Sequence, residues 1–333
     1  MMNILVTGGS GAVGPCIIHA LHQAGYQIRS FSIDTPASGM FPQNVEVLIG
    51  DVTDKAAVQS AMQGVDVVVH MAALLHIVNP PPELRERYEL VNIGGTRTVV
   101  EAAINAGVKR IILFSTIAVY GASGGQVLDE MSATKPETFY AQTKLTAEQI
   151  ILNARGVDGQ PLGTVLRLGA VYGSRIKGNY ERLLYYLARH RFIPVGSGLN
   201  RRTLVYDKDV ARAAILALEH PFAAGKVFNV SDGEFHTMND IISIMCQALG
   251  RKPPCFYLPV GPVRFAAGIF EDVAKFLGRQ PQISRALIDK FTEDVAVDSR
   301  QIQRELGFVP QYNLSAGWRD SIKEMRRSGI SQC

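Results

Sequence analysis

The sequence predicts an α/β protein, with a doubly wound parallel sheet that carries helices on both faces and a smaller lobe at its C-terminal end. Over the first two-thirds of the chain, short β-branched runs alternate with segments of helical period, which is the pattern of right-handed β-α-β units. The runs are mainly apolar rather than strictly alternating, as strands buried on both faces of a parallel sheet require. After about residue 170, glycine, proline and basic residues become more frequent and the regular alternation ends.

The predicted strands are bounded by Gly, Asn or Asp, and helices fill the intervals between them. Strands are predicted over Asn3–Thr7, Gln27–Ser32, Val45–Ile49, Val65–His70, Arg110–Ser115 and Thr164–Leu168. Helices are predicted over Gly14–Ala24, Asp54–Met62, Asn92–Ala106 and Tyr140–Ala154.

We place the domain boundary at residue 170, between a first domain of residues 1–170 and a lobe formed mainly by residues 171–333. Strands near residues 203–206 and 226–230 are predicted to return to the first domain, so the division is not a clean cut. Residues 260–277 are amphipathic and interrupted by four charged residues. We interpret them as a helix that faces the core or lines a groove, rather than one that contacts a membrane.

The composition is that of a globular protein, because 47% of the 333 residues are hydrophobic and 19% are charged. The net charge of +4 suits a small anionic ligand, and the absence of a Lys/Arg-rich run argues against a nucleic-acid partner. No apolar run approaches the ~20 residues that span a bilayer, so no membrane partner is predicted. Four cysteines without metal spacing predict reduced thiols, no metal site and a cytoplasmic location, and His70 and His76 are interpreted as structural.

A glycine-rich turn follows the first predicted strand and opens into a helix, in the order TGGSGAVG. Gly8 permits the tight turn, Gly11 lets the backbone approach a pyrophosphate, and Gly14 allows close packing of the helix on the strand. The N–H groups of the helix N-terminus, next to Ala12 and Val13, would bind the phosphates. This strand-turn-helix context predicts a Rossmann-type dinucleotide-binding domain.

The end of the second predicted strand should contain the residue that reads the ribose. Asp34 is the only acidic residue there, and a carboxylate accepts from the 2′-hydroxyl of NAD and repels a 2′-phosphate. No Lys or Arg between residues 31 and 43 is available to hold that phosphate. The sequence therefore favours NAD, although Asp34 lies late and alternatively starts the next turn.

Two further loops are candidate contacts of the dinucleotide. Asp51 and Val52 follow the third predicted strand, where Asp51 could accept from the adenine amino group. The following residues 53–54 also supply a helix N-cap. Ala72 and Ala73 follow the fourth strand, and their small side chains would let that loop pass close to the dinucleotide.

Candidate catalytic groups follow in the chain. Ser115 and Thr116 end the fifth predicted strand, at the edge where open α/β sheets bind ligands. Tyr140 and Lys144 are spaced i and i+4, so a helix places them on one face. The Lys144 ammonium, with a positive nicotinamide ring, would lower the pKa of the Tyr140 phenol from about 10 and make it a usable acid or base. A hydroxyl at the end of the fifth strand would hydrogen-bond the substrate oxygen.

The chain resembles the extended short-chain dehydrogenases/reductases of the NAD-dependent nucleotide-sugar epimerase/dehydratase type. The resemblance covers nearly the whole chain and rests on motifs in family order, namely TGGSGAVG, GDVTD, HMAA, VNIGGT, FSTIAVYG, YAQTK, RLGAVYG, RRTLVYDKDVA and RQIQRELGF.

The resemblance implies a role for individual residues. It implies that Thr116, Tyr140 and Lys144 are catalytic, and that Ser115 and Asn92 lie at the cofactor. It places Asn179 and Arg202 at the substrate, with Arg202 binding the diphosphate of a nucleoside-diphosphate sugar, for which a UDP-linked sugar is expected. It further implies a homodimer formed through the helices near residues 92–106 and 140–154.

Two positions exclude one branch of the family. In its dehydratases an Asp and a Glu follow the strand-end hydroxyl and expel water, whereas Ile117 and Ala118 stand here and carry no proton. Ala170 and Ser174 replace the Asn and Pro usual around the second VYG of 4-epimerases, so an Asn contact to the substrate is missing.

Three activities remain open. We expect an NAD-dependent UDP-sugar 4-epimerase first, and a reductase of 4-keto-6-deoxy nucleotide sugars, used in surface polysaccharides, is nearly as well supported by residues 175–184 and 200–205. A 3β-hydroxysteroid-type alcohol dehydrogenase would use the apolar residues 260–277 for a sterol. The basic residues Arg175, Lys177, Arg201 and Arg202 suit a diphosphate better. An NAD-sensing regulator is disfavoured because such proteins often lose the Tyr or Lys.

Overall fold

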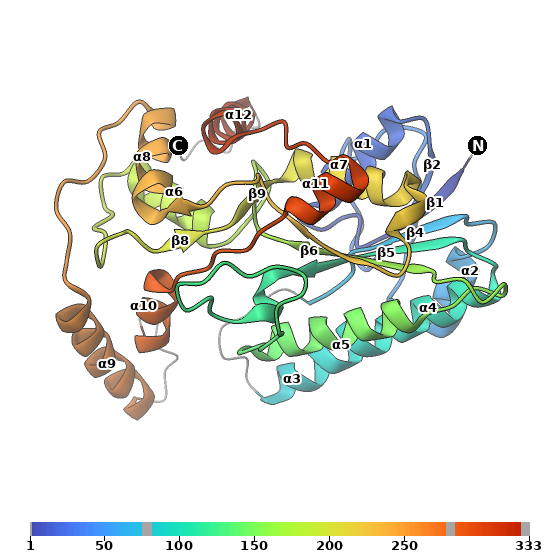
Figure 1. Cartoon of the computed structure of the whole chain (residues 1–333), viewed down its shortest axis with the longest axis horizontal. Coiled ribbons are helices and arrows are strands. Elements are labelled where there is room, and N and C mark those ends of the chain that lie inside the picture. Colours follow the sequence, from blue (N-terminus) through green and yellow to red (C-terminus); the bar gives the residue numbers. More distant parts are fainter. Residues whose placement is uncertain (1, 75–81, 278–283, 328–333) are drawn as a thin grey trace.

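The computed structural model describes residues 2–74, 82–277 and 284–327, and its centre is a parallel sheet of seven strands (Figure 1). The strand order is β10-β6-β5-β4-β1-β2-β3, so the chain starts in the middle and winds outward in both directions. This confirms the predicted doubly wound α/β class. The strands are β1 Asn3–Thr7, β2 Gln27–Ser32, β3 Glu46–Ile49, β4 Val67–His70, β5 Arg110–Thr116, β6 Gly163–Leu168 and β10 Val227–Val230.

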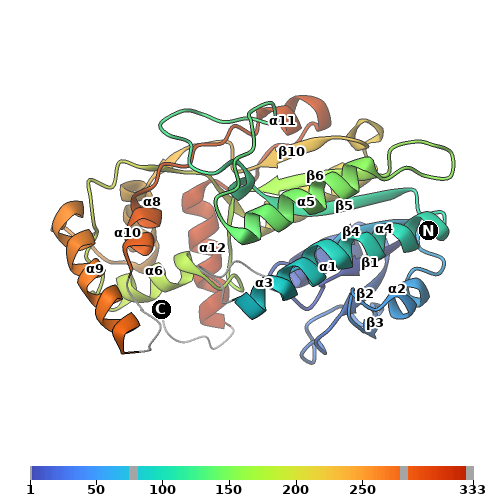
Figure 2. The ribbon, with the colours of Figure 1, turned by 90° about the horizontal axis from the view of Figure 1, so that it is seen from below.

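Helices cover both faces of the sheet, and each face has its own apolar core. On one face lie α1 Gly14–Gln23, α7 Asp207–Glu219 and α11 Arg300–Leu306. On the other lie α2 Lys55–Ala61, α3 Pro82–Tyr88, the π-helix Glu89–Gly95, α4 Thr96–Asn105 and α5 Phe139–Asn153. Figure 2 shows α3 continuing into α4 beside α5. Short 3₁₀ turns occupy Ile117–Tyr120 and Pro221–Ala223.

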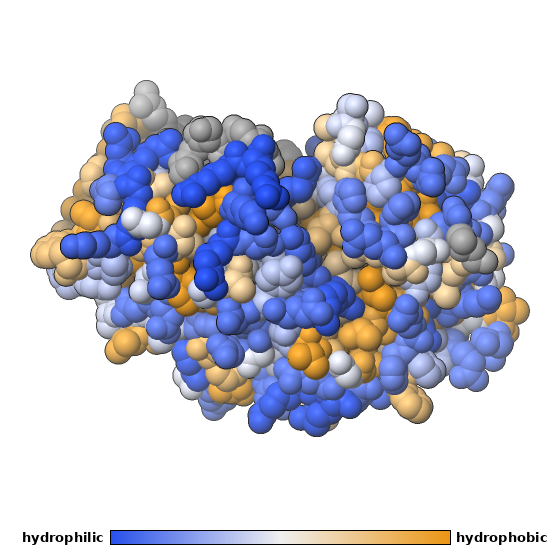
Figure 3. Space-filling model, turned by 90° about the horizontal axis from the view of Figure 1, so that it is seen from above, coloured by the Kyte–Doolittle hydropathy of each residue, from blue (hydrophilic) through white to orange (hydrophobic). Residues whose placement is uncertain are grey.

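A second, smaller unit packs around its own core beyond the carboxyl ends of the strands. Its elements are β7 Ala170–Tyr172, α6 Asn179–Ala188, β8 Arg201–Arg202, β9 Leu204–Tyr206, β11 His236–Thr237, α8 Met238–Leu249, α9 Val260–Phe276, α10 Arg285–Thr292 and α12 Leu314–Arg327. In the space-filling view a hollow separates two halves of a largely hydrophilic face (Figure 3).

Only one of the two strands predicted to return to the first domain joins the large sheet. β10 pairs in parallel with β6 at the edge of that sheet. The strand near residues 203–206 instead pairs with β7 in a separate two-stranded sheet, while its Val205 is part of an apolar core of the large sheet. The edge of β6 itself is occupied by β10. The division at residue 170 remains a prediction.

The prediction that residues 260–277 face the core or line a groove is wrong. Within α9 only Ala267 and Gly268 are buried, and Gly268 lies so close to the Arg285 guanidinium that a Cβ there would come within 2.4 Å of it. The helix packs through this narrow strip of small residues, and its larger apolar side chains lie at the surface.

The described residues include three of the four cysteines. Cys16, Cys246 and Cys255 are free thiols. His76 and Cys333 lie outside the described residues. Among the residues described, no cluster of His, Cys, Asp or Glu could hold a metal ion, and no helix is long and apolar enough to cross a bilayer.

His70 joins three elements at the centre of the sheet and is fully buried. Its Nδ1 lies 2.7 Å from Thr7 Oγ1 on β1, and its Nε2 lies 3.0 Å from Thr96 Oγ1 on α4. Because Thr96 donates its own hydrogen to the Asn92 carbonyl, it accepts from Nε2, which therefore carries a proton. Burial, with Lys144 nearby, lowers the pKa of His70 to about 3.

The depressed pKa of His70 predicts acid sensitivity. Between the unfolded pKa of 6.5 and the folded pKa of about 3, only the unfolded chain binds the proton, so stability falls as the pH falls through this window. From pH 7 to pH 5 we expect His70 alone to remove about 2 kcal/mol of unfolding free energy. Urea unfolding at both pH values should show this loss reduced in His70→Gln. The exposed His19 provides the matched control, because His19→Gln should keep the full loss.

Candidate active site

The carboxyl ends of β1, β4 and β5 converge on one edge of the sheet, and small residues let their loops touch. Gly8 has a φ of +73°, as the tight turn requires, and a Cβ there would lie 2.8 Å from the Ala72 backbone nitrogen. The Ala72 N–H also donates to Thr7 Oγ1 at 3.3 Å. The loop that begins with Ala72 therefore rests directly on the glycine turn, and the contact of Ala72 and Ala73 with the dinucleotide remains a prediction.

The glycine turn is shaped by two further close contacts. A Cβ on Gly14 would lie 2.0 Å from the Gly9 carbonyl oxygen, so the absence of a side chain at Gly14 lets the first turn of the helix pack closely on the glycine turn. A Cβ on Gly9 would lie 2.4 Å from Ser30 Oγ. Sequence reasoning missed Gly9, although its place inside TGGSG was the available signal.

The residues of this turn fit the pyrophosphate of a dinucleotide. Helix α1 begins after Val13, which has no side-chain cap, so N–H groups of its first turn remain available to an anion. At Gly11 a Cβ would meet only the Gly8 carbonyl oxygen, at 3.1 Å, so its outer side lies open where backbone must approach the ligand. Ala12 completes the turn between Gly11 and Val13.

The remaining predicted cofactor contacts lie along the same edge. Asp34 is exposed just after β2. Asp51 folds back on its own loop, where its Oδ1 accepts from the Thr53 N–H at 2.9 Å, and Val52 is buried. Asp54, rather than Asp51, caps α2, because its side chain accepts from two N–H groups of the first turn. Asp54 therefore supplies the helix N-cap, and the position of Asp51 is compatible with a contact to the adenine amino group.

Asn92 links the loop after β4 to the helix of the Tyr–Lys pair. It is buried in the π-helix, its Oδ1 accepts from the Leu74 N–H at 2.8 Å, and its Nδ2 donates to Thr143 Oγ1 at 3.0 Å. Thr143 in turn donates to the Tyr140 carbonyl at 2.9 Å. This relay fixes the backbone of Tyr140. Sequence reasoning missed Thr143, which lies inside YAQTK between the two residues that it did identify.

Ser115 does not face the site, although the sequence predicts it as a cofactor contact. Its Oγ donates to the Glu148 carboxylate on α5, and it is buried. Glu148 also receives a bidentate pair from Arg167 on β6, with the closest N–O distance 2.7 Å and exposures of 1% and 7% for the two side chains. The Arg167 guanidinium lies over the Tyr120 ring, 4.7 Å from its centroid. This buried cluster fixes α5 to β5 and β6.

Burial dominates the ionisation of the Tyr–Lys pair. Together with the neighbouring Tyr88, it raises the pKa of Tyr140 to about 12, whereas the sequence predicts a lowered value. Loss of solvation penalises the phenolate more than any nearby cation favours it. Lys144 is 4% exposed, and burial lowers its pKa to about 8 against the opposing effect of Glu148. The ammonium is therefore itself close to losing its charge.

A cavity of about 650 Å³ extends from the end of β5 into the smaller unit. Thr116 lies at its inner end, where its Oγ1 accepts from the Ala118 N–H at 3.1 Å and so keeps its own hydrogen for a ligand. The cavity reaches α5 at its N-cap Thr138, two residues before Tyr140. Ile117 and Ala118 also line it, so the two positions after Thr116 offer no proton-transfer group.

The cavity has a charged region and extensive apolar walls. Arg202, Lys290 and Arg182 line it, with Glu293 as a nearby carboxylate, and Asn179 lies at its edge on α6. Sequence reasoning identified Arg202 and Asn179 but missed Arg182 and Lys290, which lie on helices with no distinctive motif. The apolar walls are formed by Leu183, Phe192, Ile193, Val195, Met238, Leu287, Ile288, Phe291 and Val295.

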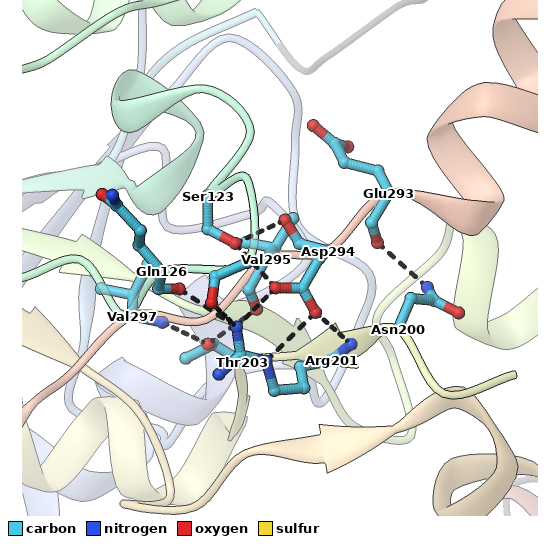
Figure 4. A network of polar contacts seen from close by, with 10 residues as sticks. Ser123, Gln126, Asn200, Arg201, Thr203, Glu293, Asp294, Val295 and Val297 are labelled. Atoms are coloured by element: carbon cyan, nitrogen blue, oxygen red, sulfur yellow. Dashed lines mark hydrogen bonds and ion pairs between the residues drawn. The ribbon is translucent and has the colours of Figure 1, made fainter.

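The adjacent arginines of β8 face different partners. Arg202 donates through one Nη to the Lys290 carbonyl at 2.5 Å and the Phe291 carbonyl at 3.0 Å, which leaves its other N–H groups for a ligand. Arg201 pairs with Asp294 at 2.7 Å and lowers the pKa of that carboxyl to about 2 (Figure 4). Arg201 is therefore structural rather than a diphosphate ligand.

The residues around Arg201 join β8 to the segment after α10. Thr203 Oγ1 donates to the Val295 carbonyl at 3.1 Å and accepts from the Val297 N–H at 2.9 Å, and Asn200 donates to the Glu293 carbonyl at 3.0 Å (Figure 4). These contacts hold the wall of the cavity that Arg202 and α10 share. Of the other basic residues considered, Arg175 is exposed and Lys177 lines a separate small pocket beside Trp318.

Known proteins resemble this chain over most of its length. Residues 4–231 match the model of the NAD dependent epimerase/dehydratase family. The chain is 30% identical over 316 residues to N-acetyl-alpha-D-glucosaminyl-diphospho-ditrans,octacis-undecaprenol 4-epimerase of Escherichia coli O157:H7, covering 95% of this chain and 92% of that relative.

Two further proteins show the range of the likeness. A 3 beta-hydroxysteroid dehydrogenase/Delta 5→4-isomerase of Mycobacterium tuberculosis H37Rv is 28% identical over 323 residues, covering 93% of this chain and 86% of that relative. The structure of MoeE5 in complex with UDP-glucuronic acid and NAD is 25% identical with a TM-score of 0.77, covering 98% of this chain and 99% of that one.

The buried Glu148–Arg167 pair predicts a large loss of stability when one partner is removed. Glu148→Ala leaves a guanidinium buried without its carboxylate and should lower the unfolding free energy by about 3–5 kcal/mol. Replacing both residues, as in Glu148→Ala with Arg167→Met, should recover a large part of this loss. Urea unfolding measures both.

The exposed pair Lys55–Glu101 is the control for the buried one, since its side chains are 76% and 58% exposed. Glu101→Ala should cost less than about 1 kcal/mol. Equal losses at the two sites would contradict a dominant role for burial.

Proposed function

Because the chain belongs to the NAD dependent epimerase/dehydratase family, it is an NAD-dependent enzyme, and we propose that it inverts C4 of a sugar carried on a diphosphate, with a UDP-sugar as the first candidate. One observation carries this proposal. The cavity joins the Thr116 hydroxyl, at the strand edge where the dinucleotide turn lies, to Arg202 and Lys290 at its charged region. A sugar can lie between a hydroxyl and a pair of cations that bind its diphosphate.

Each residue then has one task. The glycine turn and the uncapped start of α1 hold the NAD pyrophosphate, and Asp34 receives the ribose hydroxyl. Bound NAD would supply the hydride chemistry at C4 and a positive ring that opposes the effect of burial on the phenol. Tyr140 takes the proton from O4 and later returns it, while Thr116 donates to the same oxygen and Lys144 holds Tyr140 and the ribose.

The absence of acid and base after Thr116 supports hydride chemistry without elimination. Water is lost only if one group removes a proton and another protonates the leaving hydroxyl. Ile117 and Ala118 occupy the corresponding part of the cavity and do neither. Epimerisation and reduction are the two reactions that remain.

The apolar walls of the cavity favour a substrate whose diphosphate is attached to an apolar group. The E. coli relative is named for a sugar carried by undecaprenyl diphosphate, and the mycobacterial relative for a steroid. Both have an apolar moiety that the walls around Phe192 and Phe291 could contact. The cations of the cavity favour a polyprenyl diphosphate over a steroid, so the lipid-linked sugar is the second candidate substrate.

The first experiment is to denature the purified protein and identify the nucleotide released. Retained NAD(H) supports an epimerase, which reuses one cofactor within one turnover. Protein without nucleotide, followed by NADH consumption with 4-keto-6-deoxy nucleotide sugars, would establish the reductase instead. Protein that retains NAD(H) is then assayed for C4 inversion of UDP-hexoses, UDP-N-acetylhexosamines and N-acetylglucosamine on a short polyprenyl diphosphate.

A homodimer through α4 and α5 remains a prediction.

Tyr140→Phe tests the proton-transfer role. Loss of a general acid–base group should lower kcat by about 10²–10⁴-fold, while NAD affinity measured by calorimetry stays within a few-fold. Tyr186 also lines the cavity and is 46% exposed, so Tyr186→Phe should leave kcat nearly unchanged. Full activity in Tyr140→Phe would disprove the assignment.

Arg202 and Arg201 form a matched pair for the diphosphate contact. Arg202→Gln should raise KM for the sugar diphosphate by about tenfold or more, because charge-assisted bonds to phosphate are lost. Arg201→Gln removes the Asp294 pair, and we expect it to lower thermal stability with little change in KM. Equal KM effects would show that Arg202 has no specific role in diphosphate binding.

A further inference from the structure

Helix α9 has its polar side turned inward and its apolar side turned outward. The exposed fractions of its large apolar residues are 73% for Phe265, 52% for Ile269, 66% for Phe270, 51% for Val273 and 91% for Phe276. At 100° per residue these five positions share one side of the helix, and no charged residue of α9 falls among them. We call this side the α9 apolar face.

The opposite side of α9 holds Arg264, Glu271 and Lys275 and packs on α10, and Asp272 lies at the border between the two sides. Arg264 pairs with Asp289 at 2.7 Å, and Arg285 pairs with Asp272 at 2.8 Å. Gly268 lies against the Arg285 guanidinium between them. The orientation of α9 is therefore set by paired charges, and the apolar face is not a surface left open by loose packing.

The chain that leads into α9 carries exposed apolar and basic residues. Leu258, just before α9, pairs with Val195, and Phe256 on the same stretch is 65% exposed. Between Asp240 and Arg264, which is paired with Asp289, the sequence contains the basic residues Arg251 and Lys252 and no acidic one. An exposed apolar helix with basic neighbours is the pattern of helices that lie in the surface of an anionic bilayer.

We propose that the α9 apolar face docks into the surface of an anionic phospholipid bilayer. A second protein copy fits the observations less well, because stable interfaces use about 20–30 residues on each side and this face is essentially one helix. Figures 1 and 2 place α9 at the end of the molecule remote from the large sheet, where a flat surface can reach it.

Docking would bring the cavity close to lipid. Helix α10 lies between the two, since Leu287, Ile288 and Phe291 line the cavity while Asp289 pairs with α9. Because α9 lies between α10 and the lipid, the cavity is about two helix diameters, roughly 20 Å, from the docked face. This consequence, which rests on the proposed function, favours a sugar diphosphate carried by a membrane lipid over a soluble UDP-sugar.

Vesicle sedimentation tests the docking with the full-length protein. Wild type should sediment with vesicles of phosphatidylglycerol and phosphatidylethanolamine, and much less with phosphatidylcholine alone. The double variant Phe265→Asp with Phe276→Asp should bind at least about tenfold more weakly. Phe222→Asp is the matched control, because Phe222 is 67% exposed on the 3₁₀ turn that precedes β10 of the large sheet, and it should bind as wild type does.

A second measurement guards against misfolded variants. Phe276→Trp places a reporter at a site 91% exposed, and its emission should shift to shorter wavelength with the anionic vesicles. Absence of both sedimentation and shift would overturn the proposal. So would a wild-type oligomer, seen by sedimentation velocity without lipid, that the double variant dissociates, since the face would then be a protein interface.

Activity separates the docking from the proposed function. The double variant should turn over a water-soluble sugar diphosphate at the wild-type rate and a vesicle-embedded polyprenyl-diphosphate sugar at least about tenfold more slowly. Protein that binds vesicles but has no activity on any sugar diphosphate would refute the function and leave the docking intact. Equal rates of both proteins on the embedded substrate would refute a role for docking in substrate access.

Discussion

The buried pair of Glu148 and Arg167 is the interaction on which the arrangement of the site depends. Glu148 lies one helical turn after Lys144, and its carboxylate binds Arg167 of β6 and Ser115 of β5 at once. Two buried charges are expensive to desolvate and satisfy each other only in one geometry, so they specify how α5 sits on the sheet. Because Tyr140 and Lys144 lie on α5, this pair also fixes where their side chains lie. The hydrogen bonds from Asn92 through Thr143 hold the first turn of the same helix.

The close approach of three loops is the second constraint. Gly8 and Gly14 leave no space for a Cβ, so the turn after β1, the loop after β4 and the start of α1 can meet at one edge. Neutral His70 lies beneath them and hydrogen-bonds residues of β1 and α4 through the two sides of one imidazole. A rigid dinucleotide edge therefore faces a cavity whose far wall, at Arg202 and α10, is fixed by the separate network around Asp294.

Much of this arrangement could be predicted from local signals. The alternation of apolar runs and helical segments predicted the doubly wound parallel sheet, and the glycine turn follows β1 as its motif indicated. Prediction failed where two residues look alike in sequence and differ in partner. Ser115 and Thr116 are neighbouring hydroxyls, yet alternation along a strand sends one to Glu148 and the other to the cavity. Arg201 and Arg202 divide between Asp294 and the cavity for the same reason.

The sequence by itself determined the family, the dinucleotide turn and the absence of acid–base groups after Thr116, because each depends on residue types at short, fixed spacing. Only the tertiary structure decided the ionisation of Tyr140 and Lys144, since burial depends on elements distant in sequence. It also decided the outward orientation of α9. An amphipathic pattern shows that a helix has two sides, but the charges of α10 select the side that packs.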